Sequence, residues 1–290
     1  MNTPELISHY TFPGLTEGRT LIVLGAIHGD ETCGPAAIRR VMHEIDDGSI
    51  VLKKGSVRCV PVCNPRAFEG GIRFAEDNLN RIFKKTENPA SYEARLASEL
   101  CELVDQADVM LDIHSSHAAA PVNLFVDYPT AENEALAAAL GAEYVIYDWP
   151  KVYEQSSVEL DSWTTDRYAY ENGKVGILLE AGQHSDQRSE IVAYEAILHT
   201  LVHLDMIDPR TELHQVVKAM PVHMTEVFVR DSMEDVFTAQ WSHLQRVAKG
   251  TTVATRGSGE AIQMKEDGVI IFPKTYAKPG GEWFYLGILG

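Results

Sequence analysis

The chain has few cysteines, no long hydrophobic run and a shortage of positive charge. Its 290 residues include four cysteines, Cys33, Cys59, Cys63 and Cys101, at irregular spacing and without a CxxC pair. This pattern is not that of a secreted disulfide framework or a structural zinc site, so we expect buried thiols in a reducing compartment. The longest uninterrupted runs of apolar residues and glycine, 135–142 and 283–290, have eight residues each, well short of the roughly 20 residues that a membrane-spanning helix needs.

Positive charge is scarce, with 25 Lys and Arg against 42 Asp and Glu and a formal net charge of −17. Nucleic acids and anionic membranes are bound by basic surfaces, so the charge argues against both as partners. A small anionic substrate in a locally basic pocket is compatible with it, and a homo-oligomer is left open. The first residues lack the basic and apolar segments of a signal peptide, so we expect a soluble cytoplasmic protein.

Short apolar runs alternate with stretches of helical spacing between residues 20 and 205. Strands are expected at Leu21–Ile27, Val57–Cys63, Val109–Ile113, Tyr144–Tyr147 and Val175–Leu179. Helices are expected at residues 35–45, 91–104, 132–140 and 189–204. This alternation predicts an α/β fold, in which helices cover both faces of a mixed, mainly parallel sheet.

The character of the sequence changes after Asp208-Pro209. Helical patterns become rare, and glycines separate short strand-like runs. We therefore expect an α/β domain over residues 1–209 and a small β-rich domain over residues 210–290. One helical stretch near Val236–Val247 is expected to interrupt the second domain.

Two short motifs bring histidines and carboxylates together. His28 and Glu31 follow the first predicted strand in an HGDE sequence, where one turn of chain presents both to a single ion. A surface loop with a helix-capping acid is the alternative. Asp112 and His114 close the third predicted strand, and their spacing places both side chains on one side of it. A metal ligand with a supporting carboxylate and a plain buried Asp–His hydrogen bond both fit this pattern.

Two further features point to polar chemistry. Glu180 follows the apolar residues 175–179, where an acid is unusual unless it faces a polar site or caps a helix. Residues 64–85 contain five basic and three acidic side chains, a local excess of positive charge in an acidic chain. This segment is either a solvated loop or an anion pocket in which arginine offers a planar fork to a carboxylate.

These features share one position in the predicted fold. His28, Asn64, His114 and Glu180 each follow the carboxyl end of an expected strand, and ligands of open α/β sheets bind outside these ends. Two histidines and a carboxylate are a ligand set of catalytic zinc sites, and a further carboxylate can serve as general base. One shared site explains the four features better than four unrelated loops do.

The motifs together resemble the aspartoacylase/succinylglutamate desuccinylase family of zinc hydrolases with a carboxypeptidase-like core. The resemblance rests on HGDE (28–31), NPRA (64–67), IRFAEDNLNRIF (72–83), DIH (112–114) and LLEAG (178–182), in matching order and spacing. It implies an amidohydrolase that uses one zinc ion per chain and cleaves the non-peptide amide bond of a small N-acyl amino acid. A C-terminal β domain is also part of the family pattern.

The resemblance also implies roles for individual residues. His28, Glu31 and His114 would bind zinc, with Asp112 behind them, and Glu180 would be the general base and acid. Arg73 would stabilise the oxyanion. The substrate carboxylates would be held by the following residues: Asn80, Arg81 and, at a looser register, Arg167.

The chain departs from the family pattern at three places. The usual HGNE is HGDE, the usual DLNR is NLNR with Asn78 in place of the acid, and Phe272 precedes Pro273 where aspartate-type enzymes have tyrosine. The last departure leaves the side-chain specificity open. Two alternative functions remain, a zinc carboxypeptidase that acts on peptides and a non-catalytic zinc-binding protein on the same scaffold.

Overall fold

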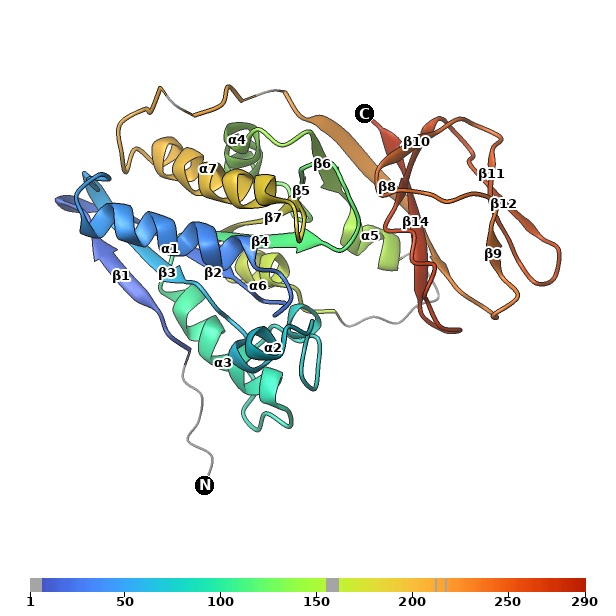
Figure 1. Ribbon diagram of the computed structural model, residues 1–290, viewed down its shortest axis with the longest axis horizontal. Coiled ribbons are helices and arrows are strands. Elements are labelled where there is room, and N and C mark those ends of the chain that lie inside the picture. The colour runs from blue at the N-terminus through green and yellow to red at the C-terminus, as the bar shows by residue number, and fades with distance from the viewer. Residues whose placement is uncertain (1–6, 155–161, 212, 217) are drawn as a thin grey trace.

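A single mixed sheet of 11 strands organises the structure, a computed structural model that describes residues 7–154, 162–211, 213–216 and 218–290 (Figure 1). The strand order is β1-β3-β2-β4-β7-β5-β6-β8-β14-β13-β10. The bounds are β1 (Tyr10–Pro13), β2 (Thr16–Gly25), β3 (Lys54–Val60), β4 (Val109–Ser116), β5 (Asn123–Phe125), β6 (Tyr144–Tyr147), β7 (Val175–Gln183), β8 (Met220–Val229), β10 (Gln245–Val247), β13 (Gly268–Ile271) and β14 (Glu282–Leu289). The central strands β3, β2, β4 and β7 are parallel neighbours, as the alternating sequence predicts.

Helices cover both faces of this sheet. α1, α4 and α7 pack on one face, and α3 and α6 lie on the other (Figure 1). The helical segments are α1 (Cys33–Asp46), α2 (Pro65–Gly70), the 3-10 turn η1 (Leu79–Arg81), α3 (Tyr92–Asp105), α4 (Ala131–Leu140), α5 (Trp149–Glu154), α6 (Thr165–Glu171) and α7 (Gln187–His203). The predicted fold class is confirmed, and each of the four predicted helices is present.

Coverage of both faces explains the continuous apolar runs. In β2, Leu21 and Val23 join the core under α1 and α7, whereas Ile22 and Leu24 join the core under α3. All four are fully buried, because successive side chains of a strand point to opposite faces. The apolar run therefore indicates a strand with no solvent-facing side, typical of a parallel sheet.

The C-terminal residues extend the same sheet and add a second, smaller one. Strand β8 pairs in parallel with β6, so the main sheet continues across the predicted boundary at residue 209. Strands β9 (Val236–Phe237), β11 (Thr252–Thr255) and β12 (Ala261–Gln263) form a separate three-stranded antiparallel sheet. The division into two domains stays a prediction, since a continuous sheet joins the two parts.

The expected helix near Val236–Val247 is wrong. The segment contains β9 and β10, joined by a loop in which Leu244 has a positive φ of 58°. The indole Nε1 of Trp241 donates to the carbonyl of Val253 at 2.8 Å, and the amide of Thr238 donates to the same carbonyl at 3.1 Å. These bonds to β11 replace the local bonds that a helix would have made.

Among the described residues, no helix is long and apolar enough to cross a membrane. All four cysteines are buried and unpaired, as expected. Burial raises the pKa of the Cys33 and Cys59 thiols to about 12, so these side chains behave as apolar core residues.

Candidate active site

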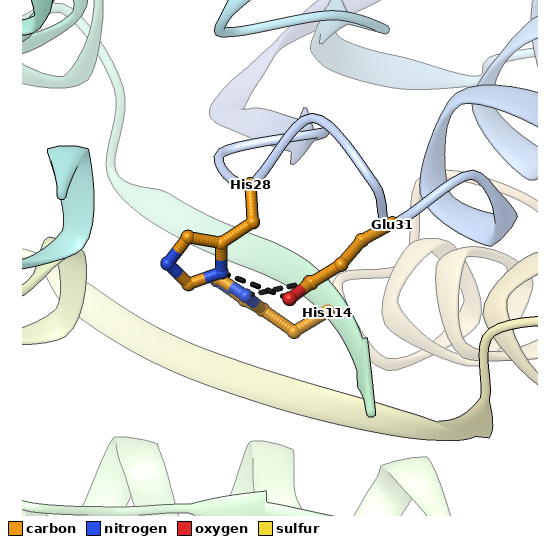
Figure 2. Close-up of side chains that lie close together, drawn as sticks. All are labelled: His28, Glu31 and His114. Atoms are coloured by element: carbon orange, nitrogen blue, oxygen red, sulfur yellow. Dashed lines mark hydrogen bonds and ion pairs between the residues drawn. The ribbon is translucent and has the colours of Figure 1, made fainter. Parts of the chain in front are cut away.

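Two histidines and a glutamate meet at the carboxyl edge of the parallel strands. His28 and Glu31 lie between β2 and α1, and His114 lies near the end of β4 (Figure 2). One carboxylate oxygen of Glu31, Oε1, is 2.9 Å from Nδ1 of His28, and the other, Oε2, is 2.9 Å from Nδ1 of His114. The three side chains are 1–2% exposed, so the sequence prediction that they converge agrees with the geometry.

The outer nitrogens of both imidazoles have fixed partners. Nε2 of His28 lies 3.0 Å from Oδ1 of Asn78, and Nε2 of His114 lies 2.8 Å from Oδ2 of Asp112. Both partners are acceptors when the Nε2 atoms carry the protons, which leaves the Nδ1 lone pairs directed at the same space. Two imidazole nitrogens and a carboxylate are a fitting donor set for zinc, and Asn78 supports His28 although the family pattern has an acid there.

The electrostatics of His28 and Glu31 also favour a cation. Burial lowers the pKa of His28 to about 4, so its ring is neutral at pH 7. Burial opposes the ionisation of Glu31, but the two imidazoles outweigh it and hold the pKa of this carboxyl well below its ordinary value. A neutral imidazole and an ionised carboxylate are the forms that bind metal.

Close packing fixes the turn that carries His28. A Cβ atom at Gly29 would lie 2.1 Å from the carbonyl carbon of Ala67 in α2, so only glycine fits there. The amide of Gly29 donates to the carbonyl of Arg73 at 3.1 Å. Ala26, two residues before His28, has a φ of 48°, a left-handed conformation that turns the chain sharply after β2. The metal-binding turn and the basic loop are thus built against each other.

Glu180 faces the triad from the neighbouring strand. It lies in β7 directly opposite His114 in the strand register. Its Oε2 atom is buried and has no hydrogen-bond partner among the described residues. Burial, assisted by the charge of Glu31, raises the pKa of Glu180 to about 7. A buried carboxyl with a free oxygen beside the triad is well placed to exchange protons with a reacting molecule.

A buried glutamate that the sequence analysis missed holds the basic loop in place. Glu93, in α3, is fully buried, and its carboxylate accepts hydrogen bonds from Nδ2 of Asn64 and from the backbone amides of Ala75, Glu76 and Asp77, at 2.6–3.2 Å. Such charge-assisted bonds are stronger than neutral ones. No local pattern marks Glu93, because its partners lie on another segment.

Three of the four arginine and asparagine residues that were predicted to contact the substrate line the same cavity as the triad. Arg73 donates from Nη1 to Oε1 of Glu31 at 3.1 Å and is 40% exposed. Oδ1 of Asn80 accepts from the amide of Thr165 at 3.0 Å, and Nη1 of Arg81 donates to the Asn80 carbonyl at 2.8 Å. Arg167 is not among the described lining residues, since it donates to the carbonyl of Ser162 and stacks on Trp163.

The cavity has a volume of about 830 Å³ and a second wall from the C-terminal part. Phe272 and Lys274 belong to this wall, and Lys274 pairs with Glu282 at 2.7 Å. The ring of Phe272 stacks on the ring of His243 with a centroid distance of 4.1 Å. The C-terminal part therefore contributes aromatic and charged side chains to the cavity.

A pair of carboxyl groups, Asp127 and Asp166, also lines the cavity. Each has one buried oxygen without a hydrogen-bond partner among the described residues. Burial and the charge of Asp166 raise the pKa of Asp127 well above its ordinary value. The sequence analysis selected Arg167 and passed over Asp166, the adjacent residue that faces the cavity.

The protein thus has an α/β fold with a mixed sheet, and the buried His–Glu–His triad at the carboxyl edge of that sheet is suited to bind a metal ion. Residues 17–203 match the model of the succinylglutamate desuccinylase/aspartoacylase catalytic domain, and the chain belongs to this family. The predicted resemblance is confirmed. The family consists of metal-dependent deacylases, which the triad fits.

Individual relatives agree with this assignment at low identity. A succinylglutamate desuccinylase from Shewanella sp. (strain MR-7) is 23% identical over 286 residues, covering 90% of this chain and 80% of the relative. A Rhodobacter sphaeroides succinylglutamate desuccinylase/aspartoacylase structure has a TM-score of 0.74 at 18% identity and covers 97% of this chain and 87% of its own. A product-bound structure of the ectoine utilization protein EutE (DoeB) from Ruegeria pomeroyi has a TM-score of 0.73 at 22% identity and covers 97% and 88%. At these identities the structures establish the fold.

Proposed function

We propose that the protein is a zinc-dependent deacylase that hydrolyses the amide bond of a small N-acyl amino acid. The observation that carries this proposal is the position of Glu180, whose buried, unpartnered carboxyl oxygen faces the His28–Glu31–His114 triad. Binding a metal does not require such a group, whereas hydrolysis requires a proton acceptor beside the reacting water.

His28, Glu31 and His114 would hold the zinc ion through Nδ1, a carboxylate oxygen and Nδ1. Zinc supplies Lewis acidity, which lowers the pKa of water and polarises a carbonyl group. The partners of the outer nitrogens, Asn78 and Asp112, keep the two imidazoles in the required tautomer.

Glu180 and Arg73 supply the protein's part of the chemistry. Glu180 takes a proton from the attacking water and later donates it to the leaving amine. Its raised pKa reflects burial, and a cation held by the triad would favour the ionised base. Arg73 reaches the triad from the basic loop and donates hydrogen bonds to the oxygen on which negative charge develops.

Asn80 and Arg81 bind the α-carboxylate of the substrate. Both line the cavity, and the guanidinium group of Arg81 supplies the local positive charge that an anionic substrate needs in an acidic protein. The nearby Asp127 and Asp166 repel a second carboxylate. Phe272 presents no hydroxyl group to such a carboxylate. We therefore infer that the amino acid has a neutral or basic side chain rather than an acidic one.

A substrate panel tests the proposal. N-acetyl and N-succinyl derivatives of acidic, neutral and basic amino acids are compared with blocked dipeptides on zinc-loaded protein, and amine release is measured. Faster turnover of the N-acyl amino acids supports deacylation, whereas preference for the dipeptides assigns the protein as a carboxypeptidase. No turnover of any compound assigns it as a non-catalytic zinc-binding protein. A Glu180→Gln preparation controls for a contaminating hydrolase.

A further inference from the structure

A second cluster of potential metal ligands lies beside the triad and has no part in the proposed reaction. Asp30, His117 and His184 come from the segments that follow β2, β4 and β7. One ligand atom from each lies within 4.8 Å of the other two. Oδ2 of Asp30 is 3.2 Å from Nε2 of His117, and the two imidazole rings are edge-to-face with centroids 4.4 Å apart.

Two buried polar atoms of this cluster have no hydrogen-bond partner among the described residues. They are Oδ1 of Asp30 and Nε2 of His184. Buried polar atoms in folded proteins are nearly always paired, so each exception needs a cause. An ion pair between Asp30 and His117 accounts for the contact between those two side chains but leaves the orphaned atoms unexplained.

The surroundings prepare His184 to act as a ligand through Nε2. Its Nδ1 atom lies 2.8 Å from Oγ of Ser115, and when Nδ1 carries the proton and donates it to the hydroxyl, the lone pair is on Nε2. The amide of His184 donates to the carbonyl of Ser116 at 2.9 Å, and Nε2 of Gln183 donates to the carbonyl of His117 at 3.1 Å. These bonds hold the two strand ends, and with them both histidines, at the rim.

We propose that Asp30, His117 and His184 bind a second divalent transition-metal ion. Two imidazoles and one carboxylate suit zinc, cobalt or manganese. Ligand atoms about 2.0–2.1 Å from a tetrahedral ion are roughly 3.3 Å apart, and Asp30 and His117 already have this spacing. The side chain of His117 is 63% exposed, so this ion binds more weakly than the ion at the buried triad.

The ion would link the three segments that also carry Glu31, His114 and Glu180. Asp30 is adjacent to Glu31, and the amide of Ser115 donates to Oε2 of Glu31 at 3.0 Å while its hydroxyl contacts His184. Asp30 is also the residue by which HGDE departs from the usual HGNE. An asparagine there is a neutral and weaker ligand. The substitution Asp30→Asn should therefore weaken the second site and leave the three ligands of the first site unchanged.

Zinc binding measured by equilibrium dialysis and elemental analysis tests the proposal without any assay of turnover. The metal-free protein is titrated with zinc from below to well above the protein concentration. The wild-type chain should bind two ions in two phases. Asp30→Asn and His117→Ala should each lose the weaker phase and keep the tighter one, and His114→Ala should lose the tighter one.

His43→Ala is the matched control, since it removes an imidazole that is 80% exposed and lies outside both clusters. It should keep both ions, and the double variant His114→Ala/His117→Ala should bind none. A wild-type protein that binds one ion overturns the second site and leaves the proposed deacylation intact. Retention of both phases in Asp30→Asn and His117→Ala overturns it as well.

Discussion

The two walls of the cavity are built in different ways. The triad wall lies at the ends of parallel strands in the fully covered core, where His28, Glu31 and His114 are almost completely buried and each has a fixed partner. The opposite wall comes from antiparallel strands and their connections and contains aromatic rings and the Lys274–Glu282 ion pair. The difference leads us to expect that changes in one wall leave the hydrogen bonds of the other in place, so that the proposed reaction chemistry and substrate selection can be altered separately.

The largest effect is expected from breaking the triad wall. His114→Ala should abolish turnover and remove the tightly bound zinc, because a three-residue ligand set loses one member. The sheet should stay folded, since His114 lies at its rim. Steady-state kinetics, elemental analysis and circular dichroism check the turnover, the zinc content and the fold, with His223→Ala on β8 as the control. Undiminished tight zinc in His114→Ala would refute the assignment.

The second-largest effect on turnover is expected from Glu180→Gln. The variant should bind zinc normally and lose about 10²–10⁴-fold in kcat, the usual contribution of a general acid–base group. Glutamine has the same shape and no charge, so the folded structure should not be destabilised. Steady-state kinetics on zinc-loaded protein provide the measurement. Nearly normal kcat would show that another group accepts the proton.

The two arginines should affect different kinetic constants. Arg73→Ala removes a contact with charge that develops during the reaction and should mainly lower kcat. Arg81→Ala removes a contact with a carboxylate that is present throughout and should mainly raise KM. Arg81→Lys should rescue only part of the loss, since an ammonium group cannot form the planar fork. Equal changes in both constants for both alanine variants would contradict this division.

Glu93→Gln tests whether the basic loop depends on the carboxylate beneath it. Replacing a charged acceptor of several hydrogen bonds should lower the free energy of unfolding by about 1–3 kcal/mol and reduce kcat as Arg73 becomes less well placed. Urea unfolding and kinetics give the two values. Glu102→Gln, at an exposed position of the same helix, should change neither. A loss of stability with unchanged kcat would show that Glu93 does not position Arg73.

The smallest effect is expected at the Asp127–Asp166 carboxyl pair, which the α/β part contributes to the cavity. Asp166→Asn removes a negative charge from the cavity and should improve kcat/KM for N-acetylaspartate, relative to a neutral N-acetyl amino acid, by about tenfold, or ~1.4 kcal/mol. Zinc content should be unchanged. Glu171→Gln, at the exposed end of α6, is the control. An unchanged preference would mean that the carboxyl pair does not contact the substrate side chain.

The sequence was informative where local pattern and tertiary environment agree. The buried runs at Leu21–Ile27 and Val175–Leu179 are apolar on both faces because helices cover both sides. His114 and Glu180 lie opposite each other near the carboxyl ends of adjacent parallel strands, the position that the sequence predicted for the site. Prediction failed near Val236–Val247, where apolar spacing reflects contacts with β11 rather than a helix. It also missed Glu93, whose partners are provided by another segment.

The pairing of β6 with β8 has a consequence for protein engineering. Four residue pairs, from Tyr144 with Met220 to Tyr147 with His223, form the parallel junction between the strands of the α/β part and the strands that follow residue 210. A chimera that takes its C-terminal strands from a relative must reproduce the register of this junction. A change of register would shift the substituted cavity wall along the strand direction relative to the triad. Strand β14 lies between β8 and β13, so the graft must include all three strands together. We therefore expect that exchange of the whole block at this junction would transfer the substrate preference proposed for this wall between members of the family.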